Sequence, residues 1–440
     1  MIELPATLVE LQHMLLRGEV SCSDALAAQH HQFASGNQKF HTAITTWPVS
    51  LDGYNENSLG RLSGIALAHK DIFNTSGRIP GLGHDEGQAV PGTPIAVVLK
   101  RLASHGAANI AALTMAEYAC GATGYNPNFE SCINPLHPDA AVGGSSSGSA
   151  VAVAGQMVYA SLGTDTVGSV RIPAATCGLH GLKTTHGLIP LDGVYPLAPS
   201  LDSVGLLTRN AFDAEQVLHA CVLPGQLRET SHSPFRVKAW IPETGLHRGI
   251  ERALSDFSNR QSCIERLGTM PEHAVLTQLA EIVLHVEAAR THRAALLDCT
   301  ASAGVETVAL AGLVIPAQWY EAALAIRPHH LRTFVQKHLE KHDILMMPAL
   351  PEPIPDASKV TTGDAAFDVK KLLGLHRYMG FINYLGLPSL VVPIALDARG
   401  LPVSVQLVAR PFHELRLLNM AQKIALPMRE QAGFLHSLSI

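Results

Sequence analysis

A run of small residues at positions 143–150, Gly-Gly-Ser-Ser-Ser-Gly-Ser-Ala, places four serine hydroxyls directly before a wholly apolar segment. Because glycine lets the backbone approach a neighbour closely, such a run can form a packing loop, an anion cradle or a nucleophile site. The P-loop spacing Gly-x4-Gly-Lys-Ser/Thr is absent, and residues 178–184 approach it only with the wrong interval. The sequence therefore does not favour a nucleotide site.

One interpretation of this run makes Ser146 the nucleophile. Gly144, Ser146 and Gly148 satisfy the Gly-x-Ser-x-Gly elbow of α/β-hydrolases, in which a downstream Asp and His serve the serine. That elbow follows directly on a buried strand, whereas Pro135 and Pro138 interrupt the approach here. An α/β-hydrolase using Ser146 remains an alternative.

A lysine at the end of an apolar strand is the second chemical feature. Residues 62–68 predict a short buried strand that delivers Lys70 and Asp71 at its end. A free lysine has a pKa of about 10.4, so Lys70 acts as a base only where burial or a helix N-terminus lowers that pKa. The alternative is an ion pair with Asp71.

Three motifs taken together resemble the amidase signature family. They are residues 68–71 (Ala-His-Lys-Asp), 143–146 (Gly-Gly-Ser-Ser) and 163–173, a stretch that includes Ser169. Lys70 and Ser145 are 75 residues apart, and Ser145 and Ser169 are 24 apart, as in that family. The resemblance covers almost the whole chain through residues 117–119, 134–135, 196–205, 386–388 and 406–411.

The resemblance implies a Ser-Ser-Lys catalytic set. Ser169 would be the nucleophile, and Ser145 would relay a proton between Ser169 and Lys70. The peptide bond between Gly144 and Ser145 would be cis. Backbone N–H groups next to the nucleophile, those of Thr166, Val167, Gly168 and Ser169, would form the oxyanion hole.

Two positions depart from the family pattern. Many members have glycine where this chain has Val167 and Ser147. Because a β-branched residue tolerates positive φ poorly, the loop geometry is expected to differ most at Val167.

Four residues are predicted to bind substrate. By resemblance, Ala119 belongs to this set. Arg171 contacts an acidic substrate or, in the alternative we favour, pairs with Asp165 to stiffen the loop. Tyr320 and Arg327 lie seven residues apart, so both can face one way on a helix and reach a substrate carboxylate, although a solvated helix face is the alternative we favour. The loops around 120–125 and 192–195, with the helical region, are expected to shape the acyl pocket.

The patterns predict an α/β fold with a large mixed central sheet covered by helices on both faces, as in the amidase signature family. One catalytic domain spans residues 1–440 and includes a variable helical region at about 213–345. The local predictions are two helices in 5–34, a helix over 149–159, a strand at 161–165, a helix starting near residue 173 and a hairpin at 389–395 and 401–408.

Composition limits the partners and the compartment. The 440 residues carry a formal charge of -5, which gives no basic field for direct nucleic-acid binding. Seven widely spaced cysteines without a Cys-x-x-Cys pair indicate reduced thiols. No signal peptide or membrane-spanning apolar run is evident, so we expect a cytoplasmic protein that binds no membrane.

No metal or cofactor is expected. His285 and His292 share helical spacing, but no His-Glu-x-x-His motif or carboxylate set completes a metal site. The predicted partner is a small-molecule amide, and a second copy of the chain, in a homodimer, is a further candidate.

The predicted function is a metal-independent amidohydrolase that cleaves a small carboxylic amide through an acyl-enzyme on Ser169. The main alternative is the amidase-like subunit of a glutamine-dependent tRNA amidotransferase, in which a partner binds the tRNA and receives ammonia. The two alternatives share the Ser-Ser-Lys chemistry and differ in substrate and assembly.

Overall fold

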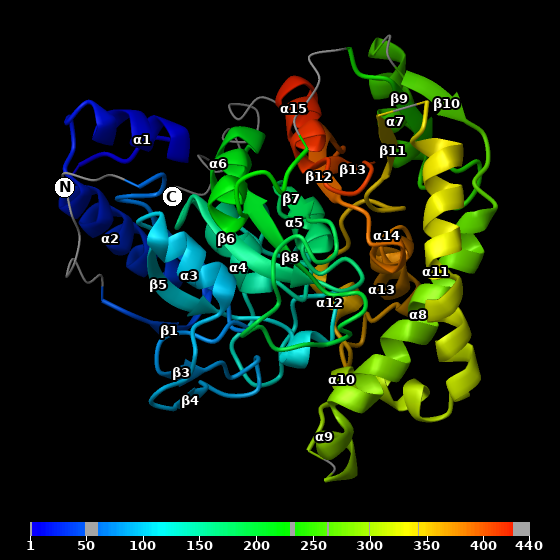
Figure 1. Ribbon diagram of the computed structural model, residues 1–440, viewed down its shortest axis with the longest axis horizontal. Helices are drawn as coiled ribbons and strands as arrows, with labels where there is room; N and C mark the ends of the chain where they lie inside the picture. Colours follow the sequence, from blue (N-terminus) through cyan, green and yellow to red (C-terminus); the bar gives the residue numbers. More distant parts are fainter. Residues whose placement is uncertain are drawn as a thin grey trace.

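An eight-stranded mixed sheet runs through the molecule (Figure 1). The computed structural model describes residues 2–48, 60–228, 234–261, 264–298, 300–341 and 343–425. Strands β10 and β11 pair with β9 in parallel, and all other neighbours in this sheet are antiparallel. The spatial order is β10 (Ile264–Leu267), β9 (Val237–Trp240), β11 (Ile344–Pro348), β13 (Pro402–Val408), β12 (Ser389–Leu396), β7 (His180–Lys183), β8 (Ser203–Thr208) and β6 (Ala160–Asp165).

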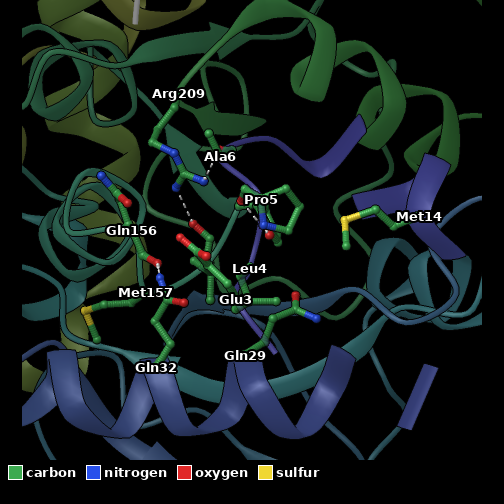
Figure 2. A pocket seen from close by; sticks show the side chains of 12 residues that line it. Glu3, Leu4, Pro5, Ala6, Met14, Gln29, Gln32, Gln156, Met157 and Arg209 are labelled. Atoms are coloured by element: carbon green, nitrogen blue, oxygen red, sulfur yellow. Dashed lines mark hydrogen bonds between the residues drawn. The ribbon is translucent and has the colours of Figure 1, made fainter. Parts of the chain in front are cut away.

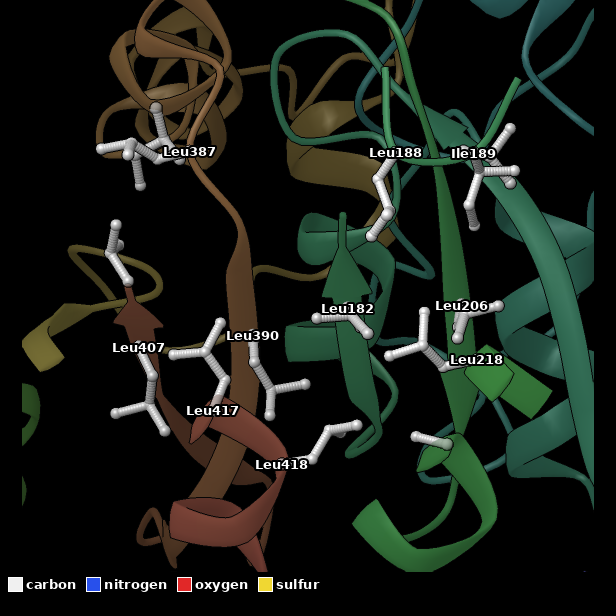
Figure 3. Packing of buried hydrophobic residues seen from close by; sticks show 14 of the residues in the cluster. Leu182, Leu188, Ile189, Leu206, Leu218, Leu387, Leu390, Leu407, Leu417 and Leu418 are labelled. Carbon is white, nitrogen blue, oxygen red and sulfur yellow. The ribbon is translucent and has the colours of Figure 1, made fainter. Parts of the chain in front are cut away.

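Helices cover both faces of this sheet, as predicted. Successive side chains of a strand point to opposite faces, so Leu206 and Leu207 of β8 lie in two different core clusters. The sheet face that carries Leu206 packs against α6 (Ala211–Cys221) and α15 (Glu414–Ile424). Figure 3 shows the leucines of these two helices against the strands. The opposite face of the sheet, which carries Leu207, is covered by α4 (Ser147–Ala154) and α5 (Arg171–Thr176).

A small three-stranded sheet stands beside β6, at the edge of the large one. Its order is β1 (Ala43–Thr46), β5 (Ala108–Leu113) and β2 (Ala66–Lys70), and every residue of β2 is buried. The Leu162 N–H of β6 donates to His69 Nδ1 at 3.1 Å, and the Ser161 hydroxyl donates to Ala68 O at 2.6 Å. These bonds place the end of β2 next to the loop that follows β6.

Most local predictions are confirmed, with shifted bounds. The two opening helices are α1 (Leu8–Leu16) and α2 (Cys22–Phe40), and Ser21 caps α2 by accepting the Asp24 N–H. The strand expected at 62–68 starts at Ala66 and includes Lys70. Helix α4 ends before Gly155, because the chain turns there to enter β6. The late hairpin forms as antiparallel β12 and β13.

The region at 213–345 is not purely helical. It holds α7 (Arg248–Arg260), α8 (Glu272–Thr291), α9 (Arg293–Leu297), α10 (Ala303–Ala309), η2 (Leu310–Leu313) and α11 (Ala317–His338), but also strands β9 and β10. These strands extend the large sheet. Charged residues of the outermost strand, Glu265 and Arg266, are exposed, so a four-residue strand with this composition carries no alternating apolar signal.

The remaining elements connect these layers. They are β3 (Arg78–Ile79), β4 (Gln88–Ala89), α3 (Val97–Ser104), η1 (Glu117–Ala119), α12 (Ala357–Val360), α13 (Val369–His376) and α14 (Gly380–Leu385). In the described part of the chain, no individual helix has the length and apolar character to cross a bilayer. One sharply bent pair, Ala303–Leu313 with Ala317–His338, meets that requirement jointly, on length and composition only.

Candidate active site

Lys70 lies at the buried end of β2 and contacts two hydroxyl groups. Its Nζ donates to Ser145 Oγ at 2.8 Å and to Thr164 Oγ1 at 3.0 Å, and the residue is 1% exposed. Burial lowers the pKa of Lys70 to about 7, although the negative charges of Asp202 and Asp165 act in the opposite direction. Lys70 is therefore partly unprotonated near neutral pH.

The alternative ion pair between Lys70 and Asp71 does not form. Asp71 instead binds Arg78, with an Nη1 to Oδ1 distance of 2.7 Å, and accepts the Gly81 N–H at 2.9 Å. The carboxylate thus faces a different loop, as alternating side chains at a strand end do.

Ser145 is held in place by its backbone. The peptide bond between Gly144 and Ser145 is cis, as the resemblance implied. The Ser145 carbonyl accepts the Ala116 N–H at 3.1 Å. Nearby, the Gly148 N–H donates to Thr114 O at 3.0 Å, and a Cβ at Gly148 would lie 2.6 Å from Thr114 Oγ1. The small residues of the run thus allow the start of α4 to pack against the end of β5.

Ser169 lies in the turn between β6 and α5, beside the run at 143–150. The Ser146 N–H donates to the Ser169 carbonyl at 3.2 Å, which joins the two loops directly. Ser169 is 4% exposed, and its hydroxyl forms no hydrogen bond within the described residues. That hydroxyl is therefore free to meet a substrate.

A buried ion pair supports the loop that carries Ser169. Asp165 accepts the N–H groups of Gly168 at 2.9 Å and Val170 at 3.2 Å, while Arg171 Nη2 donates to its Oδ1 at 2.9 Å. Burial alone would raise the pKa of Asp165, but the Arg171 guanidinium holds it well below its usual range. The carboxylate thus stays ionised and fixes the turn.

The structure places Arg171 inside the protein, not against a substrate. The residue is 0% exposed. Besides Asp165, its guanidinium donates to the side chains of Gln406 and Asn383 and to the Met379 carbonyl. With all of these donors used inside the fold, the substrate contact considered for Arg171 is corrected to the loop-supporting role.

The loop at 166–169, the candidate oxyanion hole, leaves most of its backbone donors without a protein partner among the described residues. Gly168 has φ +120, a conformation that favours glycine, and its N–H is already donated to Asp165. Within the described residues, the N–H groups of Thr166, Val167 and Ser169 have no protein acceptor. Val167 does not adopt positive φ, so its β-branched side chain fits the loop without the expected conflict.

Ala119 lies in η1, three residues after Ala116, whose N–H donates to the Ser145 carbonyl. Tyr118 and Ala119 have φ of 51 and 63, which is uncommon for residues with a side chain. The Tyr118 ring lies 6.4 Å from that of Tyr195 and 5.0 Å from that of His292. Tyr118 precedes the 120–125 loop, and its ring meets the two other segments predicted to shape the pocket, 192–195 and the helical region.

Tyr320 and Arg327 lie on one side of α11, as their spacing predicted. The Tyr320 hydroxyl donates to Glu287 Oε1 at 2.8 Å, and Arg327 Nη1 donates to Ser200 O at 2.7 Å. Glu287 in turn accepts the Ser200 N–H at 2.8 Å. Arg327 also reaches the Asn383 carbonyl at 3.4 Å, and the Asn383 amide donates to Asp165 O at 2.8 Å. These contacts connect the pair to the Ser169 loop.

Ser146 lacks the partners of a hydrolase nucleophile. Its hydroxyl is 3.5 Å from Thr164 O, no histidine contacts it within the described residues, and no strand immediately precedes the run.

Two residues of the site were missed by the sequence analysis, Thr164 and Asp202. Asp202 accepts from Thr166 Oγ1 at 2.6 Å, and burial raises its pKa to about 6. Both lie in motif segments, but only the fold shows what they contact.

The cysteines and histidines do not form a metal site among the described residues, where no group of three His, Cys, Asp or Glu is suitably gathered. Burial raises the pKa of the Cys120 and Cys177 thiols to about 12, as expected for packed, unreactive side chains. Cys263 and Cys299 lie outside the described residues.

Comparisons with known proteins identify the family of this chain. The amidase family model matches residues 22–248 and 314–418. A glutamyl-tRNA(Gln) amidotransferase subunit of Nitrosococcus oceani is 30% identical over 82% of this chain and 83% of its own length. The same subunit of Halorhodospira halophila is 30% identical over 95% of this chain and 96% of its own.

A solved crystal structure described as an amidase superimposes with a TM-score of 0.79 at 27% identity, covering 94% of this chain and 98% of its own. The family match leaves out 249–313, within the region expected to vary. These matches over most of the sequence and the fold show that the chain belongs to the amidase signature family, whose enzymes act on carbon–nitrogen amide bonds.

Proposed function

We propose that this protein is an amidohydrolase that cleaves a carboxylic amide through an acyl-enzyme on Ser169. The observation that carries the proposal is the buried contact of Lys70 Nζ with Ser145 Oγ at 2.8 Å. With its pKa lowered to about 7 by burial, Lys70 is able to accept a proton near neutral pH. The Ser145 loop is joined to the Ser169 loop by the backbone bond from Ser146.

The proposed reaction runs in two halves. Neutral Lys70 takes the Ser145 proton while Ser145 takes that of Ser169, whose Oγ attacks the amide carbonyl. The proton returns through Ser145 to the departing nitrogen as the carbon–nitrogen bond breaks. Water then attacks the ester, and its proton passes through Ser145 to Lys70. As the carbon–oxygen bond to Ser169 breaks, that proton returns through Ser145 to Ser169 Oγ, which releases the acid and restores neutral Lys70.

The oxyanion would be stabilised by the N–H groups of Thr166, Val167 and Ser169. Their lack of protein acceptors within the described residues supports this assignment, since preorganised donors are the main source of such stabilisation. Gly168, whose N–H is donated to Asp165, contributes by shaping the turn.

Ala119, Tyr320 and Arg327 are proposed to contact the rest of the substrate. Arg327 is a half-buried cation whose Nη1 partner is a neutral carbonyl, so a substrate carboxylate would form a stronger, charge-assisted bond there. Ala119 lies on the segment bonded to the Ser145 carbonyl and would contact the scissile end. This arrangement favours a small amide that carries an anionic group.

A second candidate is the amidase-like component of a glutamine-dependent tRNA amidotransferase. It is supported by relatives that carry the name of a glutamyl-tRNA(Gln) amidotransferase subunit, two of which match over 82% or more of both chains. Glutamine is itself a small amide with a carboxylate. The acyl-enzyme chemistry is shared, and what differs is whether ammonia is released or passed to a partner.

Ammonia release over a panel of amides tests both candidates. The panel includes glutamine and carboxylated, aliphatic and aryl amides, with fluorophosphonate labelling of the serine in parallel. Ser169→Ala should abolish labelling and turnover, whereas the matched Ser146→Ala retains both. Labelling that survives Ser169→Ala would show that the nucleophile is another residue. Turnover confined to glutamine, increased by a copurifying protein, would favour the amidotransferase.

A further inference from the structure

A cavity of about 440 Å³ lies between the N-terminal segment and α2, away from the catalytic loops (Figure 2). Arg209 donates there to the carbonyls of Val158 and Ala6, and the Tyr159 hydroxyl donates to Pro5 O. These hydrogen bonds hold the N-terminal segment in place, so the groups that make them are already used within the protein. The outer surface of α11 differs, because its side chains point away from the fold.

Helix α11 lies at the side of the molecule opposite the N-terminal helices α1 and α2 (Figure 1). Its inner face packs against α8 and α14 and carries the buried residues Ala323, Phe334 and His338. With 22 residues and a rise of 1.5 Å per residue, the helix is about 33 Å long. The opposite face is exposed along most of this length.

The exposed face of α11 carries five residues at alternating intervals of three and four. We call them the α11 stripe, and they are Trp319, Ala322, Ile326, His329 and Thr333, all of which are exposed. Trp319 is 60% exposed and Ile326 is 43% exposed. Such an interval keeps side chains in one line along a helix, and it is the spacing by which two helices pack along a common seam. The stripe contains no carboxylate, lysine or arginine.

Two exposed charges, Glu321 and Arg332, border the α11 stripe on the same side. They are eleven residues apart, which is about three turns at 3.6 residues per turn, so their side chains leave the helix in nearly the same direction. Within the described residues, the ion pairs of α11 are those of Lys337 and His338 with Glu272 of α8. Glu321 and Arg332 are therefore available to charges outside this part of the chain.

We propose that the α11 stripe is the contact surface of a homodimer, in which α11 of a second copy packs against it in the antiparallel direction. A two-fold axis near Ile326, the middle of the stripe, brings Glu321 of each copy beside Arg332 of the other. Both ion pairs form together, because residues on the same side of an antiparallel seam face each other. A parallel pair in register would leave these opposite charges about three turns apart.

The sizes of the stripe residues fit the same arrangement. Trp319 and Thr333 lie seven residues on either side of Ile326, so the indole ring of one copy falls opposite a small side chain of the other. Ala322 allows the two backbones to approach closely. Large apolar residues such as Trp319 are the ones that protein interfaces bury at their centre. One helix pair is a small interface, so we expect a dimer that dissociates on dilution.

A second copy suits this surface better than a bilayer does. Helices that lie on membranes present many large apolar residues to the lipid and cations beside them. The α11 stripe has two large apolar residues, Trp319 and Ile326, and the carboxylate of Glu321 borders it. The proposal does not depend on the proposed function, because it involves none of the catalytic residues.

The test is analytical ultracentrifugation of the full-length chain at increasing concentration, where we expect a reversible equilibrium between monomer and dimer. Ile326→Glu brings two carboxylates together near the two-fold axis and should weaken dimerisation at least tenfold. Leu16→Glu is the matched control, because Leu16 is a 71% exposed apolar residue of α1, and this variant should dimerise as the parent does. Circular dichroism verifies that each variant is folded.

Exchange of the two charges tests the antiparallel direction. Glu321→Arg and Arg332→Glu, each alone, place like charges beside each other and should weaken the dimer, whereas the double variant should restore the parent affinity. A monomer at every concentration, an unaffected Ile326→Glu dimer or a double variant weaker than both single variants would overturn the proposal. A monomeric chain that cosediments with phosphatidylcholine vesicles, but fails to do so as Ile326→Glu, would overturn it in favour of a membrane.

Discussion

Two buried lysines, Lys70 and Lys183, have the same lowered pKa but different partners. In both residues burial is the main cause, and it lowers the pKa to about 7. Lys70 Nζ donates to the hydroxyls of Ser145 and Thr164. Lys183 Nζ, at the end of β7, donates to the backbone carbonyls of Thr184 at 2.8 Å and Leu387 at 2.9 Å.

The difference between these partners separates the proposed catalytic environment of Lys70 from the structural environment of Lys183. A hydroxyl donates as well as accepts, so a neutral lysine next to it is able to take its proton. A carbonyl has no proton to give, so Lys183 ties the end of β7 to the segment that enters β12. A lowered lysine pKa thus reports burial, and only the neighbouring groups determine whether proton transfer follows.

The largest effect is expected when each lysine is replaced by methionine, which keeps the length of the side chain. Lys70→Met should lower kcat/KM by about 10²–10⁴, the usual contribution of general acid–base catalysis. Lys183→Met should stay within about tenfold of the parent, measured as ammonia release per folded molecule. Comparable losses in both variants would show that the two environments do not differ in the way proposed.

The free energy of unfolding should fall more in Lys183→Met than in Lys70→Met, the opposite order to the loss of activity. Lys183→Met removes the donor from two carbonyls, and leaving buried acceptors unsatisfied costs about 1–3 kcal/mol in the free energy of unfolding. Lys70→Met should cost less, because the Ser145 and Thr164 hydroxyls can turn towards other partners. Urea denaturation of both variants checks the order, and a less stable Lys70→Met variant would contradict it.

The pH dependence of turnover should follow Lys70 alone. Because the proposed base is the neutral lysine, kcat/KM should fall about tenfold for each pH unit below the Lys70 pKa of about 7, and level off above it. A Lys183→Met variant should retain this acidic limb, since Lys183 is not in the relay. If the limb instead disappears in Lys183→Met, the titrating group has been assigned to the wrong lysine.

The sequence brought together the residues of the proposed site but did not predict the side chains that surround them. Motif spacing brought together Lys70 and Ser145, which the structure places in hydrogen-bond contact, and two apolar runs around a turn with Gly400 predicted the β12–β13 hairpin. Lys183 was not predicted as a buried amine, because a single lysine in a short apolar stretch does not reveal its burial. The direction of Arg171 likewise depends on Asn383 and Gln406, more than 200 residues away along the chain.

The smallest predicted effect concerns Asp202, whose negative charge raises the pKa of Lys70. Asp202→Asn removes that charge, so the Lys70 pKa falls further and the acidic limb of kcat/KM moves to lower pH. Relative to its own plateau, the variant should retain about threefold more activity at pH 6 than the parent does. Asp202→Glu is the matched control, because it keeps a carboxylate beside Lys70 while it changes the geometry of the side chain. Whatever its maximum value, the kcat/KM of this control variant should fall over the same pH range as that of the parent. A limb that moves equally in both variants would mean that loop geometry, and not the Asp202 charge, sets the pKa of Lys70.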